Sequence, residues 1–420
     1  MRFFIAIAAA VVLTSTAYAG HHEKKAVIEQ YTKIAHAMYS DSLTTAKRLQ
    51  SIVNRLIAQP TEANLAAART AWLAARVPYQ QTEVYRFGNA IVDDWEGKVN
   101  AWPLDEGLID YVAASYGAES EENPFYRANV IANKSIKISG KTVDTSRITK
   151  ALISKTLHEV NEVESNVATG YHAIEFLLWG QDLNGNGPGA GNRPASDFDP
   201  KNCSWGNCDR RAAYLKAASD LLVDDLVWMT NQWAPNGKAT VGLVKGDVKK
   251  GLSTILTGMG SLSYGELAGE RMKLGLMLKD PEEEHDCFSD NTHNSHYYDA
   301  LGIRNIYLGE YRRIDGSVVK GPSLSSLVAK TSKGVDQELR SKLDATMSAM
   351  GKLVKAAEAG EAYDQMIGPN NKAGNARVQA AVDALTSQTK SIEKAVAALG
   401  LSRIKFEGSD SLDNPSAVFQ

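Results

Sequence analysis

A histidine and a glutamate three residues apart are the clearest candidates for chemistry in this chain. His172 and Glu175 belong to the stretch Gly-Tyr-His-Ala-Ile-Glu, which begins at Gly170. On a helix, residues three apart project from the same face, with Cβ atoms about 5 to 6 Å apart. The spacing therefore lets an imidazole nitrogen and a carboxylate oxygen bind one metal ion.

The residues around the pair predict that it is buried. Phe-Leu-Leu-Trp follows at 176–179 and makes the expected helix apolar on nearly every side. Burying an imidazole and a carboxylate costs free energy unless each has a partner. A metal ion would be such a partner. The alternative is a core histidine that hydrogen-bonds to a neighbouring acid, as buried polar groups usually do.

A second group of ligand-type residues lies more than a hundred residues further on. His285, His293 and His296 fall within twelve residues and are interspersed with Asp286 and Asp290. Imidazole with carboxylate suits iron or zinc, whereas calcium takes oxygen ligands alone. Helix capping is the alternative role for this segment, because Ser, Asp and Asn are common N-cap residues.

Four segments together resemble the imelysin family, also called the M75 peptidases, and in particular its iron-regulated branch. The first is Gly-x-His-x-x-Glu at 170–175, followed by Leu-Leu-Trp-Gly-Gln-Asp. The others are Tyr-Gln-Gln-Thr-Glu at 79–83, Ala-Trp-Pro-Leu at 101–104 and His-Asp-Cys-Phe-Ser-Asp-Asn-Thr-His at 285–293. The likeness covers about residues 25 to 400 and implies two helical bundles whose signature segments meet at a site that binds iron.

The resemblance extends the set of candidate site residues. The candidate metal ligands are His172, Glu175, Glu83, His285 and His293. Candidates for binding or orienting a ligand are Arg86, Trp102, Asp286, Ser289 and Asp290. Two simpler roles stay open: Glu83 and Arg86, three apart, could pair with each other, and Trp102 could serve packing.

The resemblance also leaves more than one activity open. Iron acquisition by an exported protein, with iron as the metal and zinc as the alternative, is the first hypothesis. A metallopeptidase is the second, although it requires a metal with an open position and His-Glu-x-x-His is absent from the chain. A metal-free module that binds a peptide or protein is the third. A calcium loop starting at Asp182 is not expected, because its twelfth position is Arg193.

Hydrophobic periodicity predicts an all-α fold of two packed helical bundles with the site between them. Apolar residues recur at intervals of three and four from Lys24 to Ala58, and a second helix is expected from Thr61 toward Phe87. A Gly-rich and Asn-rich loop then ends near Asp209. We expect an N-terminal bundle at 20–209 and a C-terminal bundle at 210–420, with a small hairpin near 135–141.

The N-terminus and the composition predict an exported protein. Residues 1–19 resemble a signal peptide cleaved after Ala19, which places the mature protein in the periplasm. No cysteine follows the apolar run to carry a lipid anchor, and no later segment has the roughly 20 apolar residues of a membrane span. Export makes a disulfide between Cys203 and Cys208 the simple expectation, with Cys287 left over.

The charge of the chain narrows the class of partner. The formal net charge is −3, and no cluster of Lys and Arg is present. This argues against nucleic acid or an anionic membrane surface as a partner. The expected partners are a metal ion or a small metal-linked ligand, together with an envelope protein of iron uptake.

Overall fold

The computed structural model describes residues 3–117, 120 and 123–419, with the backbone alone for residues 3–19. Helices make up 66% of the chain and strands 4%, which confirms the predicted all-α fold. The few strands form two antiparallel hairpins on the surface. Their bounds are β1 (Ser135–Ile138), β2 (Lys141–Asp144), β3 (Glu310–Arg312) and β4 (Val318–Lys320).

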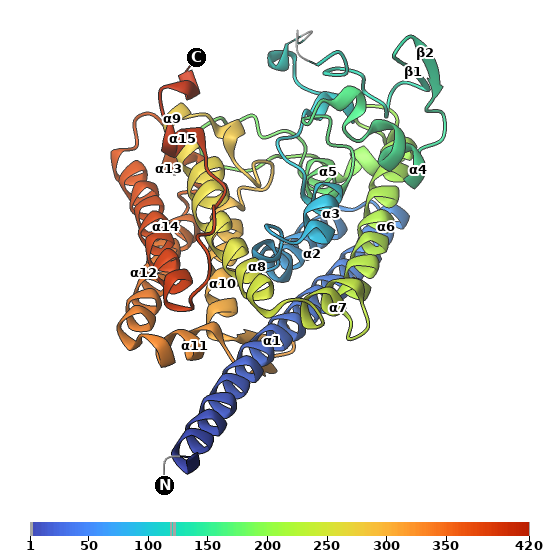
Figure 1. Cartoon of the computed structure of the whole chain (residues 1–420). Helices are drawn as coiled ribbons and strands as arrows, with labels where there is room; N and C mark the ends of the chain where they lie inside the picture. Colours follow the sequence, from blue (N-terminus) through green and yellow to red (C-terminus); the bar gives the residue numbers. More distant parts are fainter. Residues whose placement is uncertain (1–2, 118–119, 121–122, 420) are drawn as a thin grey trace.

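The first group of helices is arranged around the long helix α1 (Phe3–Ala58), with the N-terminus at its far end (Figure 1). Both α2 (Glu62–Gln80) and α6 (Cys208–Trp233) pack along α1. Residues 61–65 begin α2 as expected, since the Thr61 hydroxyl accepts the Asn64 N–H. The apolar positions of α1 predicted from periodicity are buried, which confirms the helix.

The second helix ends earlier than the sequence predicts. It ends at Gln80, because the Gln81 and Thr82 N–H groups both turn back to the Tyr79 carbonyl. A short 3₁₀ turn, Glu83–Tyr85, follows. Because of this turn, Glu83 does not continue the face of α2, and its side chain binds Arg271 of a later segment.

Helix α5 (Gly170–Trp179) carries the His172 and Glu175 pair through the centre of the first group. It packs against α2, α6 and α3 (Ala90–Asn100), and all ten of its residues are buried. The sequence prediction of a buried helix is therefore confirmed. Smaller elements of this half are α4 (Lys150–Leu152), α7 (Lys238–Val244) and several 3₁₀ turns.

The second group of helices lies beside the first (Figure 1). The two long helices of this group pack against each other. A third helix, α10 (Thr292–Leu308), contacts one of these two helices and also contacts α2 of the first group. The helices are α8 (Val248–Ser261), the π-helical segment η7 (Leu262–Leu274), α9 (Gly275–Leu278), α10 (Thr292–Leu308), α11 (Leu324–Thr331), α12 (Lys333–Glu358), α13 (Tyr363–Ile367), α14 (Lys372–Ala398) and α15 (Asp410–Asp413). The long pair is α12 and α14.

The predicted boundary at residues 209/210 falls within the first turn of α6. That helix packs against α1, α3 and α5, so the chain beyond 209 first completes the group formed by the earlier helices. The division into two domains stays a prediction. What positions the site is the contact of α10 with α2, because it brings the loop before α10 next to α5.

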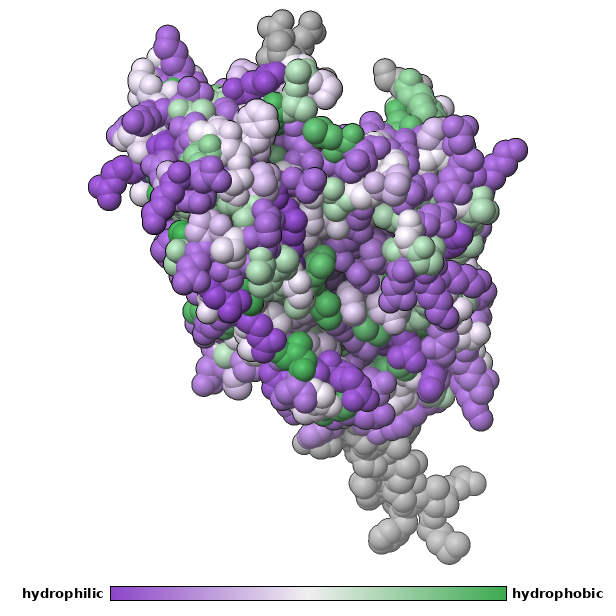
Figure 2. Space-filling model, turned by 180° about the vertical axis from the view of Figure 1, so that it is seen from behind, coloured by the Kyte–Doolittle hydropathy of each residue, from purple (hydrophilic) through white to green (hydrophobic). Residues whose placement is uncertain are grey.

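Three further predictions concern the covalent and membrane state of the chain. Cys203 and Cys208 form the predicted disulfide, and Cys287 is free. The side chains of residues 1–19 lie outside the described part, so the signal peptide and its cleavage stay predictions. Among the described residues, every helix is too short or too polar to cross a membrane. The face in Figure 2 is largely hydrophilic, with hydrophobic residues in small groups.

Candidate metal centre

The backbone conformation and the close surroundings of residue 170 explain why the motif begins with glycine. Its φ of +79° lies in the left-handed region that favours glycine. A Cβ built on Gly170 would lie 2.4 Å from the Val99 carbonyl oxygen at the end of α3. The absence of a side chain therefore lets α5 begin directly against α3, and it fixes where His172, two residues later, points.

The loop between residues 284 and 291 brings the second set of candidates to the same place. Trp102 donates its indole N–H to the Glu284 carbonyl at 2.8 Å, and its ring meets His285 edge to face with centroids 5.7 Å apart. Trp102 thus holds the loop and packs on its histidine. Trp102 therefore serves both packing and the site, because its indole supports the position of His285.

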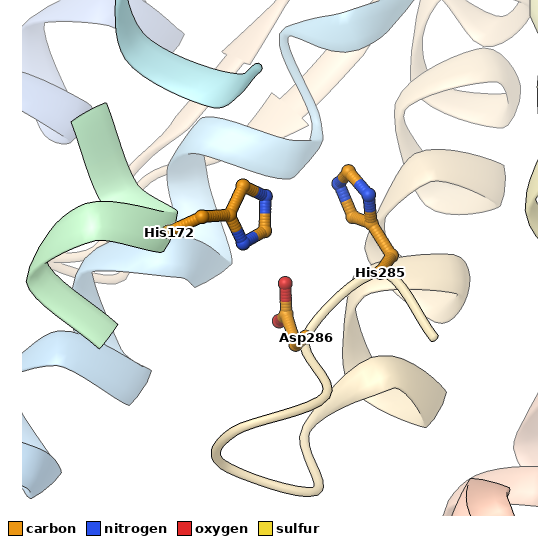
Figure 3. A group of neighbouring side chains, drawn as sticks. All are labelled: His172, His285 and Asp286. Atoms are coloured by element: carbon orange, nitrogen blue, oxygen red, sulfur yellow. The ribbon is translucent and has the colours of Figure 1, made fainter. Parts of the chain in front are cut away.

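Three buried side chains from the two segments converge. His172, His285 and Asp286 each offer one ligand atom, and these atoms lie within 4.8 Å of one another. Figure 3 shows His172 projecting from α5 toward His285 and Asp286 on the loop. The imidazole rings are edge to face, with centroids 4.7 Å apart. All three residues were candidates from the sequence, and the family resemblance implied that their segments meet; which of the candidates converge is decided by the structure.

Glu175 contacts His172 and lies outside the group of three. Its Oε2 is 3.0 Å from His172 Nδ1, and its Oε1 accepts the backbone N–H and the hydroxyl of Ser289 at 3.0 and 2.6 Å. Burial, followed by the charge of Asp286, raises the pKa of Glu175 well above its usual value, and the short contact places a proton between its Oε2 and His172 Nδ1. The other ring nitrogen, Nε2, has no hydrogen-bond partner among the described residues.

Asp286 is held by donors that the sequence reasoning did not identify. Its Oδ1 accepts from Arg76 at 2.7 Å, and its Oδ2 accepts from Asn291 at 2.8 Å and from the Ser295 hydroxyl. Arg76 also donates to Asn100 at 2.6 Å and is 1% exposed. Arg76 lies four residues after Trp72 and three before Tyr79, on an apolar face of the helix. A buried arginine needs an acid as its partner, so its position there is a sequence signal that a buried acid lies nearby.

The electrostatics of the group keep both imidazoles neutral. Burial, followed by the charge of Arg76, lowers the pKa of His172 to about 3. Burial, followed by Arg271, lowers the pKa of His285 well below its usual value. Burial raises the pKa of Asp286, but Arg76, His172 and the hydrogen bonds of Ser295 and Asn291 together outweigh it, and the net shift is downward. At neutral pH the group therefore offers two lone pairs and one carboxylate.

Glu83 and Arg86 do not pair with each other among the described ion pairs. Glu83 binds Arg271 of η7 at 2.8 Å, and Arg271 also binds Glu266 at 2.7 Å and Asp299 at 3.0 Å. Arg86 reaches other acids on α3 and η7, namely Asp93, Glu96 and Glu266. The early end of α2 gives both residues partners from distant segments. The structure places Glu83 in this network, outside the group of three.

The remaining histidines and acids of this segment lie outside the group of three. Ser289 supports Glu175, as described above. Asp290 adopts a φ of +56°, and one of its carboxylate oxygens has no partner among the described residues. His293, in the first turn of α10, is half-buried, and burial lowers its pKa to about 4. His296, which the sequence reasoning noted without assigning a role, is fully buried, and both of its ring nitrogens lack partners.

Comparison with known proteins decides the family. The family model described as imelysin (peptidase M75) matches residues 35–392. The chain belongs to the imelysin family. Its resemblance to that family, inferred from four short segments, is therefore confirmed.

Individual relatives agree with this assignment. Iron-regulated protein A of Synechococcus elongatus is 35% identical over 78 residues, which are 19% of this chain and 22% of that protein. The match thus spans about a fifth of that relative. An iron-regulated protein A precursor from Parabacteroides distasonis has a similar structure, with a TM-score of 0.65 and 19% identity, covering 90% of this chain and 95% of that one.

An imelysin-like protein from Psychrobacter arcticum has a TM-score of 0.59 and 15% identity, with 92% of this chain and 98% of that one covered. At these identities the two structures support the fold.

Proposed function

We propose that this imelysin-family protein binds an iron ion through His172, His285 and Asp286, and that it serves iron acquisition in the cell envelope. The observation that carries the proposal is the convergence of two buried imidazoles and a carboxylate within 4.8 Å. His172 Nε2 and His285 Nδ1 have no partner among the described residues. Buried polar atoms are nearly always satisfied, so a ligand for them is expected.

The donor set fits iron. Two histidines and one carboxylate with further open positions are a common ligand set for Fe(II) outside haem. The residues around them act as a second layer, since Glu175 orients His172 and Arg76 orients Asp286. Zinc accepts the same ligands and is the alternative metal.

Export and a partner belong to the same proposal. The relative from Synechococcus elongatus is an iron-regulated protein, which supports a role in iron supply. The apolar N-terminal segment supports export to the periplasm, where an envelope iron-uptake protein would receive or deliver the ion.

Peptidase activity is the rival function, and the site offers a specific test of it. Three protein ligands with an open position also suit a catalytic zinc. Hydrolysis would then require a base for the attacking water. Glu175 is the acid beside His172, but its Oε2 already contacts His172 Nδ1 and its Oε1 already accepts the Ser289 hydroxyl. We therefore expect metal binding without peptide turnover.

Metal titration of two variants tests the proposal. Chelator-treated protein is titrated anaerobically with Fe(II) and separately with Zn(II), and bound metal is measured by elemental analysis after gel filtration. We expect one ion per chain in the wild type and in His36→Ala, a half-buried histidine of α1. We expect none in His172→Ala/His285→Ala. A wild type without metal above background would overturn the proposal.

Assaying the metal-loaded protein on a peptide library separates the rival. Cleavage that disappears in His172→Ala/His285→Ala would assign the site to a metallopeptidase. Metal binding with no cleavage supports the iron-binding function.

A further inference from the structure

One segment of the second group adopts an unusual helix. The segment η7 (Leu262–Leu274) is π-helical over 13 residues, whereas most π-helices are single turns inside α-helices and are often found at functional sites. Hydrogen bonds in a π-helix join residues five apart instead of four. A π-helix of this length therefore needs support from outside the segment.

The π-helical register brings the acid partners of Arg271 together. Arg271 Nε donates to Glu266 Oε1 at 2.8 Å, and these two residues are five apart in sequence. Side chains five apart point about 140° away from each other on an α-helix, whereas on a π-helix they lie one turn apart on nearly the same face. Arg271 also binds Glu83 at 2.8 Å and Asp299 at 3.0 Å. We call Arg271 with these three acids the Arg271 cluster.

The Arg271 cluster joins the two helices that hold Asp286 in the metal centre. Glu83 follows α2, and α2 carries the arginine that donates to Asp286 at 2.7 Å. Asp299 lies on α10 one turn after Ser295, whose hydroxyl also donates to Asp286. By binding Glu83 and Asp299 together, Arg271 ties α2 to α10 beside the centre.

The C-terminal segment at residues 401–413, which we call the strap, lies along this helix. It returns from the end of α14 beside α8 and η7 (Figure 1). A Cβ built on Gly260 would lie 2.3 Å from the Phe406 ring, and one on Gly265 would lie 2.7 Å from the Glu407 carbonyl oxygen. These glycines are five apart and meet neighbouring residues of the strap. The strap therefore fits the π-helical register, because on an α-helix the two glycines would point about 140° apart.

Hydrogen bonds fasten the strap to the same face. The Glu407 backbone N–H donates to the Ser261 hydroxyl at 3.0 Å, just before η7 begins. The Ser411 hydroxyl donates to the Gly269 carbonyl at 3.0 Å, and a Cβ built on Gly269 would lie 2.3 Å from Ser409 Cβ. The strap thus contacts η7 from its start to Gly269.

The other side of the strap is loosely packed. A cavity of about 780 Å³ is lined by strap residues 403–406 and by α14. Arg403, Lys405 and Glu407 of the strap are exposed. Helix α14 has its own contacts with α12 and η7. The strap can therefore detach while these helices remain packed.

We propose that the strap is releasable and regulates the metal centre through η7. When it lies on the glycine face, it holds η7 in the π-helical register and Arg271 in its cluster. When it is displaced, η7 is free to adopt the α-helical register, Arg271 turns away from Glu266, and α2 and α10 loosen around Asp286. The effect on the metal rests on the proposed iron function, whereas the effect of the strap on η7 does not.

Hydrogen exchange in the metal-free, full-length protein tests the effect on η7. Gly269→Ala places a Cβ against Ser409 and displaces the strap, so the amides of residues 262–274 should exchange about tenfold faster than in the wild type. Gly351→Ala in α12 is the matched control, because no atom of a neighbouring described segment lies within 4 Å of a Cβ built there. Ala favours a helix over Gly, so the control should exchange no faster than the wild type.

A second variant acts from the side of the strap. Phe406→Ala/Ser411→Ala removes the ring that lies on Gly260 and the hydroxyl that binds the Gly269 carbonyl. It should reproduce the faster exchange of residues 262–274. Unchanged exchange of these residues in both Gly269→Ala and Phe406→Ala/Ser411→Ala would overturn the proposal.

Metal affinity tests the effect on the centre. In a competition titration with Zn(II), Gly269→Ala should raise the Kd about tenfold, because Asp286 is held less firmly, whereas Gly351→Ala should leave the Kd unchanged. Faster exchange of η7 with an unchanged Kd would overturn regulation of the centre by the strap. Absence of metal binding in the wild type would refute the proposed function, and the exchange experiment would still decide whether the strap holds η7.

Discussion

Replacing Glu175 by Gln tests whether this carboxylate positions His172 or binds the metal itself. Gln has the same shape, and its one oxygen can still accept the two donors of Ser289. Its amide N–H₂ then faces His172 Nδ1, where the carboxylate oxygen lies at 3.0 Å in the wild type. An N–H facing Nδ1 favours the tautomer that carries its proton on Nε2, the nitrogen that faces the metal.

The magnitude follows from this change of tautomer. Loss of the group that orients a metal-bound histidine typically costs 10–100-fold in metal affinity. This corresponds to about 1.4 to 2.7 kcal/mol. The variant should therefore still bind one ion at saturation, with a Kd raised by one to two orders of magnitude. If Glu175 were a direct ligand, as the sequence alone suggested, stoichiometric binding would be lost as in His172→Ala.

Competition titration of Zn(II) or Fe(II) against a chelator of known affinity measures the effect. Ser289→Ala is the matched control, because it removes one donor to Oε1 and leaves the contact between Glu175 and His172 intact. We expect its effect on the Kd to be smaller than that of Glu175→Gln. An unchanged Kd in Glu175→Gln would refute the positioning role, and loss of all bound metal would refute it in favour of direct ligation.

Three other perturbations have predictable outcomes. Arg76→Met removes the cation of a buried pair and should lower the free energy of unfolding of the metal-free protein by about 3 to 5 kcal/mol, as measured by urea denaturation; a loss below about 1 kcal/mol would contradict the pairing with Asp286. Burial lowers the pKa of His296 to about 3, so the unfolded state takes up a proton below about pH 6.5 while the folded state does not. The stabilisation that comes from burying neutral His296 is present above about pH 6.5 and is lost as the pH falls toward 3. Between pH 7.5 and pH 5, the free energy of unfolding of the wild type, measured with urea, should therefore fall by about 2 kcal/mol more than that of His296→Phe. Reducing the disulfide between Cys203 and Cys208, which are 5 apart in sequence, should cost about 2 kcal/mol in the same assay, since so short a loop loses little entropy on closure, and metal stoichiometry should not change.

The sequence by itself determined the features that depend on neighbours along the chain. The apolar periodicity of α1 fixed an amphipathic helix, because residues three and four apart share a face whatever lies opposite. The same rule placed His172 and Glu175 together, and the structure joins them at 3.0 Å. The disulfide between Cys203 and Cys208 was equally local. The family also followed from sequence, since its motifs are short and contiguous.

The tertiary structure alone decided which distant residues complete the site. His172 meets His285 and Asp286 because α10 packs on α2 and carries the preceding loop to α5, a contact that no spacing along the chain encodes. Helix α2 ends at Gln80, and so Glu83 turns to Arg271 of η7 and not to Arg86. Burial, which lowers or raises every pKa in the centre, exists only once these segments have packed.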